Sequence, residues 1–219
     1  MSTMSFSIPR TIYYGEGSLE KLSLLKGKRA AIVTGGNSMK KFGFLDQAAA
    51  LLQKAGIESI IIDGVEPNPS VETVVKGGKA MLDFGPDWIV AIGGGSALDA
   101  AKVMWCFYEH PELSFEDIIT PGSMPSLRNK AQFIAIPSTS GTASEITAFS
   151  VITDTAKHIK YPILAADMLP DIAILDPALP MTMPKHITAN TGPDVKAHPV
   201  EALASTAATA FTDPNPVHA

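Results

Sequence analysis

Hydrophobic and polar positions follow two alternating patterns along the first part of the chain. Short runs rich in Ile, Val and Ala predict buried strands at residues 29–34, 58–63, 87–92 and 132–136. Between them, apolar residues at helical spacing predict helices over 42–55, 71–84 and 96–109. Strands that are apolar throughout and separated by helices are typical of parallel sheets with both faces covered. The pattern predicts a doubly wound, mostly parallel α/β fold, Rossmann-like, with helices on both faces.

The pattern changes after the fourth predicted strand. Residues 137–145 form a polar loop of small side chains, residues 149–154 and 158–163 predict a hairpin, and residues 169–177 supply another strand. From Pro184 onward the Ala- and Thr-rich sequence predicts one helix, interrupted at Pro199, and then a loop over 211–219. We expect the α/β domain to occupy residues 1–182, and residues 183–219 to be a short helical C-terminal remnant of an all-α domain.

Composition and charge narrow the classes of protein. Hydrophobic residues make up 46% of the 219 residues and charged residues 18%, which suits a soluble protein with a well-filled core. The formal net charge of −5, with no block of Lys or Arg, argues against nucleic acid or an anionic membrane as the main partner. The single cysteine, Cys106, lies in an apolar run and is predicted to be a buried thiol. Neither a basic–apolar leader nor a membrane-length apolar run is visible, so a cytoplasmic location is expected.

The stretch GGGSALDAAK, residues 93–102, directly follows a predicted strand. Successive glycines let the backbone approach a ligand closely, and the N-terminus of the following helix favours a phosphate. Ser96 and Asp99 also match a capping box, which would make this an ordinary helix start. Because a cap does not explain three successive glycines, phosphate binding is the favoured prediction.

A second polar loop, PSTSGTASE, leaves the next predicted strand. The hydroxyls of Thr139, Ser140 and Thr142 could surround a ribose or a phosphate, although a capped turn would explain the same residues. Since α/β sheets bind ligands at the carboxyl ends of their strands, the two loops together predict a nucleotide site.

The loop after the first predicted strand bears on the choice of dinucleotide. In many dinucleotide sites an acidic residue here holds the ribose 2′-hydroxyl and would repel a 2′-phosphate. This chain instead has the neutral residues Gly35, Gly36, Asn37 and Ser38, followed by two lysines. The loop favours NADP over NAD, unless Lys40 and Lys41 are merely a solvated helix start.

Asp194 and His198 are four residues apart, a spacing at which both side chains on one helix face can share a metal ion. Acid–histidine pairs at this spacing are also common on ordinary helices. Pro193 and Pro199 bracket the pair, and an interior proline costs a helix about 3 kcal/mol.

In this order, GGGSALDAAK, PSTSGTASE, LPDIAILDP and TGPDVKAH resemble the iron-containing (group III) alcohol dehydrogenases, relatives of glycerol dehydrogenase and dehydroquinate synthase. The resemblance implies a dinucleotide in a cleft between an α/β and a helical domain, beside Fe²⁺ or Zn²⁺. It implies hydride transfer between a small primary alcohol or aldehyde and the nicotinamide, with the metal as Lewis acid. It also implies cofactor contacts at Lys160 and Leu175, and metal ligation by Asp194 and His198. The full candidate cofactor-binding set is Gly35, Gly36, Asn37, Ser38, Gly94, Gly95, Ser96, Asp99, Thr139, Ser140, Thr142, Lys160 and Leu175.

The chain departs from the family pattern near its C-terminal end. Two further histidine ligands of the family belong to the helical domain beyond residue 219, and Pro193, Lys196 and Pro199 replace residues of the usual motif. We expect a truncated chain whose cut surface has been resurfaced, with metal binding weak or absent and little or no turnover. The alternatives to a dehydrogenase are an inactive NAD(P)-binding module and a structural scaffold. An edge strand could also pair two copies of the chain.

Overall fold

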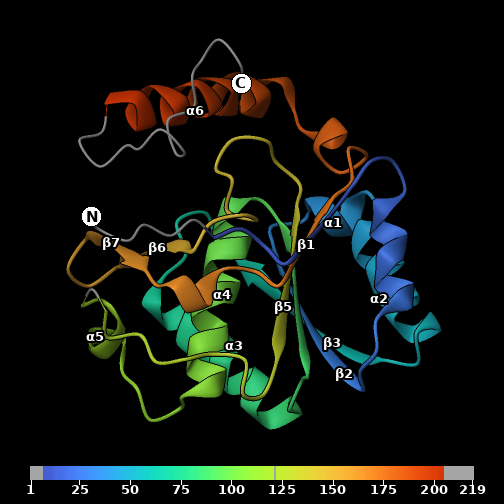
Figure 1. Ribbon diagram of the computed structural model, residues 1–219, viewed down its shortest axis with the longest axis horizontal. Helices are drawn as coiled ribbons and strands as arrows, with labels where there is room; N and C mark the ends of the chain where they lie inside the picture. The colour runs from blue at the N-terminus through green and yellow to red at the C-terminus, as the bar shows by residue number, and fades with distance from the viewer. Residues whose placement is uncertain (1–6, 121, 205–219) are drawn as a thin grey trace, which may run out of the picture.

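The computed structural model describes residues 7–120 and 122–204, and its centre is a six-stranded parallel sheet in the order β1-β8-β5-β4-β2-β3 (Figure 1). The strands of this sheet are β1 (Thr11–Tyr14), β2 (Arg29–Gly35), β3 (Glu58–Val65), β4 (Trp88–Gly93), β5 (Gln132–Pro137) and β8 (Ile172–Leu175). The predicted parallel sheet is therefore confirmed, and β4 is buried along its whole length.

Helices cover both faces of the sheet, as predicted. The helical elements are η1 (Ser18–Leu24), α1 (Ser38–Lys41), α2 (Phe44–Lys54), α3 (Val71–Phe84), α4 (Gly95–Glu109), α5 (Phe115–Ile118), η2 (Ala166–Met168), η3 (Pro180–Thr182) and α6 (Lys185–Ala204). One apolar cluster joins α3 and α4 to one face of the sheet, and a second joins α2 and η1 to the other. Within the described residues, no helix is both long and apolar enough to cross a membrane.

The helix predicted over 42–55 is wrong at its start. The chain turns at Gly43, whose φ of 80° is left-handed, and this turn separates α1 from α2. Glycine adopts that conformation at no steric cost, whereas most side chains resist it. Because of the break, Ser38 to Lys41 form a separate short helix that follows directly on β2.

The predicted hairpin is confirmed as β6 (Phe149–Asp154) and β7 (Ile159–Leu164), which pair antiparallel outside the main sheet. Its apolar side chains Ile152 and Ile163 are buried in the cluster that contains α4. The hairpin therefore packs on a helix rather than on a strand edge.

Helix α6 lies across the carboxyl ends of the strands (Figure 1). The predicted interruption at Pro199 is wrong, because α6 continues through both Pro193 and Pro199. Proline has a φ compatible with a helix but cannot donate to the carbonyl four residues earlier. The helix is mostly exposed, so water can satisfy those carbonyls. The predicted loop over 211–219 lies outside the described residues, and the division of domains at residue 182 stays a prediction.

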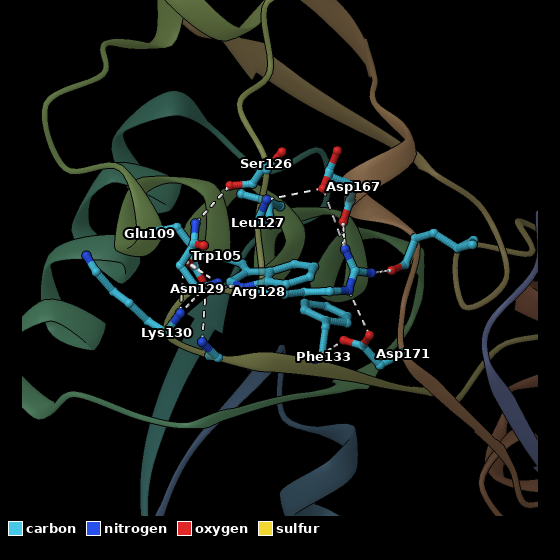
Figure 2. Close-up of polar contacts among 12 residues, drawn as sticks. Trp105, Glu109, Ser126, Leu127, Arg128, Asn129, Lys130, Phe133, Asp167 and Asp171 are labelled. Atoms are coloured by element: carbon cyan, nitrogen blue, oxygen red, sulfur yellow. Dashed lines mark hydrogen bonds and ion pairs between the residues drawn. The ribbon is translucent and has the colours of Figure 1, made fainter.

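A polar network fastens the opposite, amino-terminal end of the sheet (Figure 2). The buried Glu109 carboxylate accepts N–H groups of the segment that leads into β5, with N···O distances of 3.0 Å from Asn129, 2.9 Å from Lys130 and 3.0 Å from Ala131. Arg128 donates from Nε to Asp171 Oδ1 at 2.7 Å. The network ties the C-terminal end of α4 to the start of the strands.

Candidate functional site

The predicted site loops meet at the point where the order of the strands reverses. From β2 the chain first adds β3 on one side, and then returns to add β4 on the other side. The loops that leave β2 and β4 therefore diverge, which opens a crevice between Gly35 and Gly94. The sequence predicted that the candidate ligand-binding loops lie at this edge of the sheet, and in the structure these loops are close together.

A cleft with a volume of about 600 Å³ lies in this crevice. It is lined by the following residues, among others: Gly35, Gly36, Gly94, Gly95, Ser96, Asp99, Thr139, Thr142 and Lys160, all from the predicted set, with Val65, Pro67, Asn68 and Val151. The lining comes from the loops after β2, β3, β4 and β5, the start of α4, the β6–β7 hairpin, and Ile187 and Thr191 of α6.

A second cleft, of about 460 Å³, lies beside the first. It is lined by Asn37, Ser38 and Lys41 of the loop and helix after β2, and by the segment before α6. Gly94 and Thr139 line both clefts. An elongated ligand could therefore occupy both clefts, with its centre at the start of α4.

The two remaining members of the predicted set lie farther along the sheet edge. Ser140 and Leu175 line a third cleft of about 390 Å³, which Thr139 also lines. Glu145 and Asp176 contribute carboxylates to this cleft. The structure thus distributes the predicted cofactor residues over three adjoining clefts rather than one.

The capping-box interpretation of Ser96 and Asp99 is wrong. Helix α4 has Gly94 as its N-cap, in an extended conformation and without a side-chain cap, so Ser96 already lies in the first turn. The Asp99 carboxylate instead accepts the N–H of Val151 in β6 through Oδ2 at 3.0 Å. No cap occupies the helix N-terminus, so its free N–H groups can bind an anion.

Gly35 lies where the backbone of β2 passes close to β3. A Cβ atom at this position would lie 2.7 Å from the carbonyl oxygen of Val65. An acidic side chain at position 35 would therefore require β2 and β3 to separate. The packing of the two strands therefore explains the absence of an acidic side chain at position 35.

Asn68 is a cleft residue that the sequence did not single out. It has a positive φ of 58°, and its Oδ1 accepts a hydrogen bond from Lys160 Nζ at 2.7 Å. Asparagine tolerates this conformation better than most residues. The sequence did contain an indication of this residue: Asn68 lies in the loop PNPS, which follows a predicted strand. Such a loop is expected at the same edge of the sheet as the glycine-rich loops.

Three titratable groups lie at the floor of the clefts: Lys102 is fully buried, while the cleft-lining Asp99 and Glu145 are half-buried. Burial raises the pKa of the Asp99 and Glu145 carboxyls, although the Lys102 ammonium opposes both shifts. Burial also lowers the pKa of Lys102 to about 8, against the attraction of the two carboxylates. At neutral pH Lys102 is therefore mostly an ammonium, with no exposed surface.

Asp194 and His198 both lie on α6, one turn apart. The helix approaches the loop after β5, since a Cβ atom at Gly141 would lie 3.1 Å from Asp194 Oδ2. Among the described residues, no group of three or more His, Cys, Asp or Glu side chains is placed to hold a metal ion. Two donors do not fit the four-ligand set of a stable metal site.

The fold and its clefts define a Rossmann-like α/β protein whose polar loops gather at the carboxyl edge of a parallel sheet. The family model for iron-containing alcohol dehydrogenase matches residues 9–177. The chain belongs to this family.

Individual relatives agree with this assignment. The chain is 58% identical to an NADPH-dependent butanol dehydrogenase of Clostridium saccharobutylicum, over 96% of this chain and 54% of that protein. It is 41% identical to an alcohol dehydrogenase of Thermococcus barophilus, over 95% of this chain and 56% of that protein. The chain thus spans about half the length of these two relatives.

Solved structures show the same fold. An iron-containing alcohol dehydrogenase from Thermococcus thioreducens superposes with a TM-score of 0.87 at 41% identity, covering 95% of this chain and 56% of that one. A 1,3-propanediol oxidoreductase superposes with a TM-score of 0.88 at 33% identity, covering 97% and 56%.

Proposed function

We propose that this chain binds a dinucleotide, with NADP preferred over NAD, across the two clefts that meet at Gly94. The observation that carries the proposal is that Gly94 and Thr139 line both clefts at the uncapped start of α4. A dinucleotide has two nucleosides joined by a pyrophosphate, and this arrangement offers two cavities on either side of an anion-binding helix end.

Each part of the cofactor has a matching set of residues. The pyrophosphate would contact Gly94, Gly95 and Ser96, and the 2′-phosphate of the adenosine half would lie near Asn37, Ser38 and Lys41. The other half would then occupy the larger cleft with Thr142 and Lys160. The butanol dehydrogenase relative is NADPH-dependent by name, which supports the same preference.

The reaction proposed for the complete protein is oxidation of a small primary alcohol, or reduction of the corresponding aldehyde. When bound, NADPH supplies the hydride for the reduction. The described residues of this chain hold the phosphates, orient the nicotinamide half and exclude water from one side of it. The relatives named for butanol and 1,3-propanediol support this substrate class.

We also propose that Asp194 and His198 are the metal-binding side chains of this chain, for Fe²⁺ or Zn²⁺. With only two donors among the described residues, binding is expected to be far weaker than at a four-ligand site. The expected result is cofactor binding with little or no turnover. Alcohol-dependent NADPH formation that requires added Fe²⁺ and is abolished in His198→Ala would instead support catalysis by this chain.

The choice of cofactor is tested by fluorescence titration with NADPH and NADH. Lys41→Ala should raise the Kd for NADPH about tenfold and leave the Kd for NADH unchanged, because only NADPH carries the 2′-phosphate. Lys40→Ala is the matched control, since this neighbouring lysine is exposed and does not line the cleft. No saturable binding of either nucleotide would support the structural scaffold instead.

A further inference from the structure

The β6–β7 hairpin carries Lys160 to the 600 Å³ cleft, yet it is not part of the main sheet. Its attachment to the rest of the molecule therefore decides where the Lys160 ammonium lies. Most of the hydrogen bonds described below are made by β6. Lys160 is on β7, which is paired with β6 in an antiparallel ladder.

Helix α4 supplies most of the polar attachments. Lys102 Nζ donates to the carbonyl oxygens of Thr147 at 2.6 Å and Phe149 at 2.8 Å, at the entry to β6. Its carbon chain and ammonium have no exposed surface. A buried ammonium is retained only where it is well paired, and here it lies near the Asp99 and Glu145 carboxylates.

Asp99, one turn earlier on α4, continues the same attachment along β6. Its Oδ2 accepts the N–H of Val151 at 3.0 Å, and its carbonyl oxygen accepts the Ser150 hydroxyl at 2.9 Å. The helix whose N-terminus lines the two clefts thus holds the strand whose partner carries Lys160.

The hairpin also touches the loop after β3. The Thr153 N–H donates to the carbonyl oxygen of Pro69 at 2.8 Å, and Lys160 reaches Asn68 from the strand paired with β6. The position of Lys160 against Asn68 thus depends on the attachment of β6 to α4 and on this loop contact together.

We propose that Lys102 is a positioning residue for the cofactor: by anchoring β6 to α4 it fixes the distance between the phosphate-binding end of α4 and Lys160. This role rests on the proposed binding of NADPH. Lys102 does not itself touch the cofactor in this proposal, since it lies beneath the clefts and its Nζ is occupied by two carbonyl groups.

A double-mutant cycle separates this role from a general effect on the fold. The variants are Lys102→Met, Lys160→Met and the double variant, with Lys79→Met on the exposed side of α3 as control. Each single change at Lys102 or Lys160 should raise the Kd for NADPH about tenfold, and the double variant should be within about twofold of Lys160→Met. The Lys79 control should bind as the unchanged chain does.

Amide hydrogen exchange gives an independent readout. In Lys102→Met, exchange in the β6–β7 hairpin should rise about tenfold or more while β4 and β5 stay within about twofold of the unchanged chain. Lys160→Met should leave hairpin exchange unchanged. If Lys102→Met does not fold, Lys102→Gln repeats the cycle, because its amide retains an N–H donor without the charge.

The outcomes distinguish the two proposals. Additive losses in the double variant, or unchanged hairpin exchange in Lys102→Met, would overturn the positioning role while leaving cofactor binding intact. Absence of NADPH binding by the unchanged chain would overturn the proposed function and the positioning role with it.

Discussion

At the scale of single residues, the candidate site depends on positions where a side chain is absent. Gly94 is the N-cap of α4 with φ −75° and ψ 178°, an ordinary extended conformation. A Cβ atom there would lie 3.4 Å from Thr139 Cγ2, which is a normal van der Waals contact. The folded chain therefore has room for alanine at this position, and the glycine is explained by what the cleft must receive.

Gly94→Ala should leave stability nearly unchanged and weaken nucleotide binding. The free energy of unfolding should change by less than about 0.5 kcal/mol, because no contact or left-handed conformation is lost. The Kd for NADPH should rise about tenfold or more, because the methyl group projects between the two clefts where the pyrophosphate would lie. Urea unfolding and fluorescence titration on the same samples measure both quantities. Equal NADPH affinity in the two proteins would contradict the proposed phosphate position.

Burial of Lys102 makes stability depend on pH in a defined direction. Its pKa is about 8 in the folded chain, against the ordinary 10.5 expected after unfolding. Between these values the unfolded chain holds more protons on this residue, so the free energy of unfolding rises with pH, by up to about 3 kcal/mol.

Comparison with Lys102→Met isolates this contribution, since methionine does not titrate. Urea unfolding of both proteins between about pH 7 and pH 10 should show the unchanged chain gaining stability relative to the variant as pH rises. A difference that stays constant over this range would show that Lys102 titrates alike in both states.

At the scale of elements, α6 differs from the other long helices. It contains two prolines and is mostly exposed, whereas α4 is buried on almost every side. Because proline has no N–H group, Pro193 cannot donate to the carbonyl of Ala189, and Pro199 cannot donate to that of Val195. These two carbonyls therefore lack their helical hydrogen-bond donor.

Replacing Pro193 and Pro199 by alanine should strengthen α6 without stabilising the α/β core. Each change restores a backbone donor and removes an interior cost of about 3 kcal/mol from the helix. Amide exchange in residues 185–204 should slow by about tenfold or more, while the main urea transition stays where it is. A coincident rise in the unfolding midpoint would show that α6 and the core unfold as one unit.

The elements also show what the sequence could and could not predict. Helix α3 has the bounds predicted from its apolar spacing, and the structure adds the reason for them: the Ser70 side chain caps its start and Gly85 ends it in a left-handed conformation. The break at Gly43 was missed because apolar residues continue at helical spacing on both sides of it. The path of α6 through Pro199 was missed because a proline rule for an average helix does not include exposure to water.

Parts of the candidate site were likewise predictable from the sequence, and other parts were not. Glycine-rich and hydroxyl-rich loops after strands were predictable, because parallel strands end at one edge of the sheet. Asp99 was misassigned because its hydrogen-bond partner, Val151, is 52 residues away in the sequence. Asn68 was missed for a similar reason, since its contact with Lys160 exists only after the hairpin packs on α4. Long-range pairing of side chains is not encoded in local spacing.

At the scale of the whole molecule, affinity and stability are expected to depend on opposite ends of the sheet. The clefts lie at the carboxyl end, while the Glu109 network lies at the amino end (Figure 2). The 15 residues of α4 connect them, a length of roughly 20 Å.

Glu109→Ala should therefore have the reverse effect of Gly94→Ala. It should lower the free energy of unfolding by about 3 kcal/mol, because three backbone N–H groups lose their acceptor. The Kd for NADPH, measured at a temperature where the variant is folded, should stay within about twofold. Glu112→Ala is the control, since this nearby carboxylate is exposed and should change stability by less than about 0.5 kcal/mol. A large loss of affinity in Glu109→Ala would show that the two ends are coupled.

Helix α4 has a further consequence for how this protein tolerates change. From Ala97 to Glu109 only Asp99 is not fully buried, so the helix has no solvent-facing stripe on which substitutions can accumulate. A saturation scan would show intolerance at nearly every position of α4, whereas α2 and α3 would show it at every third or fourth. During evolution, the sequence of α4 is therefore expected to change more slowly than the sequences of α2 and α3.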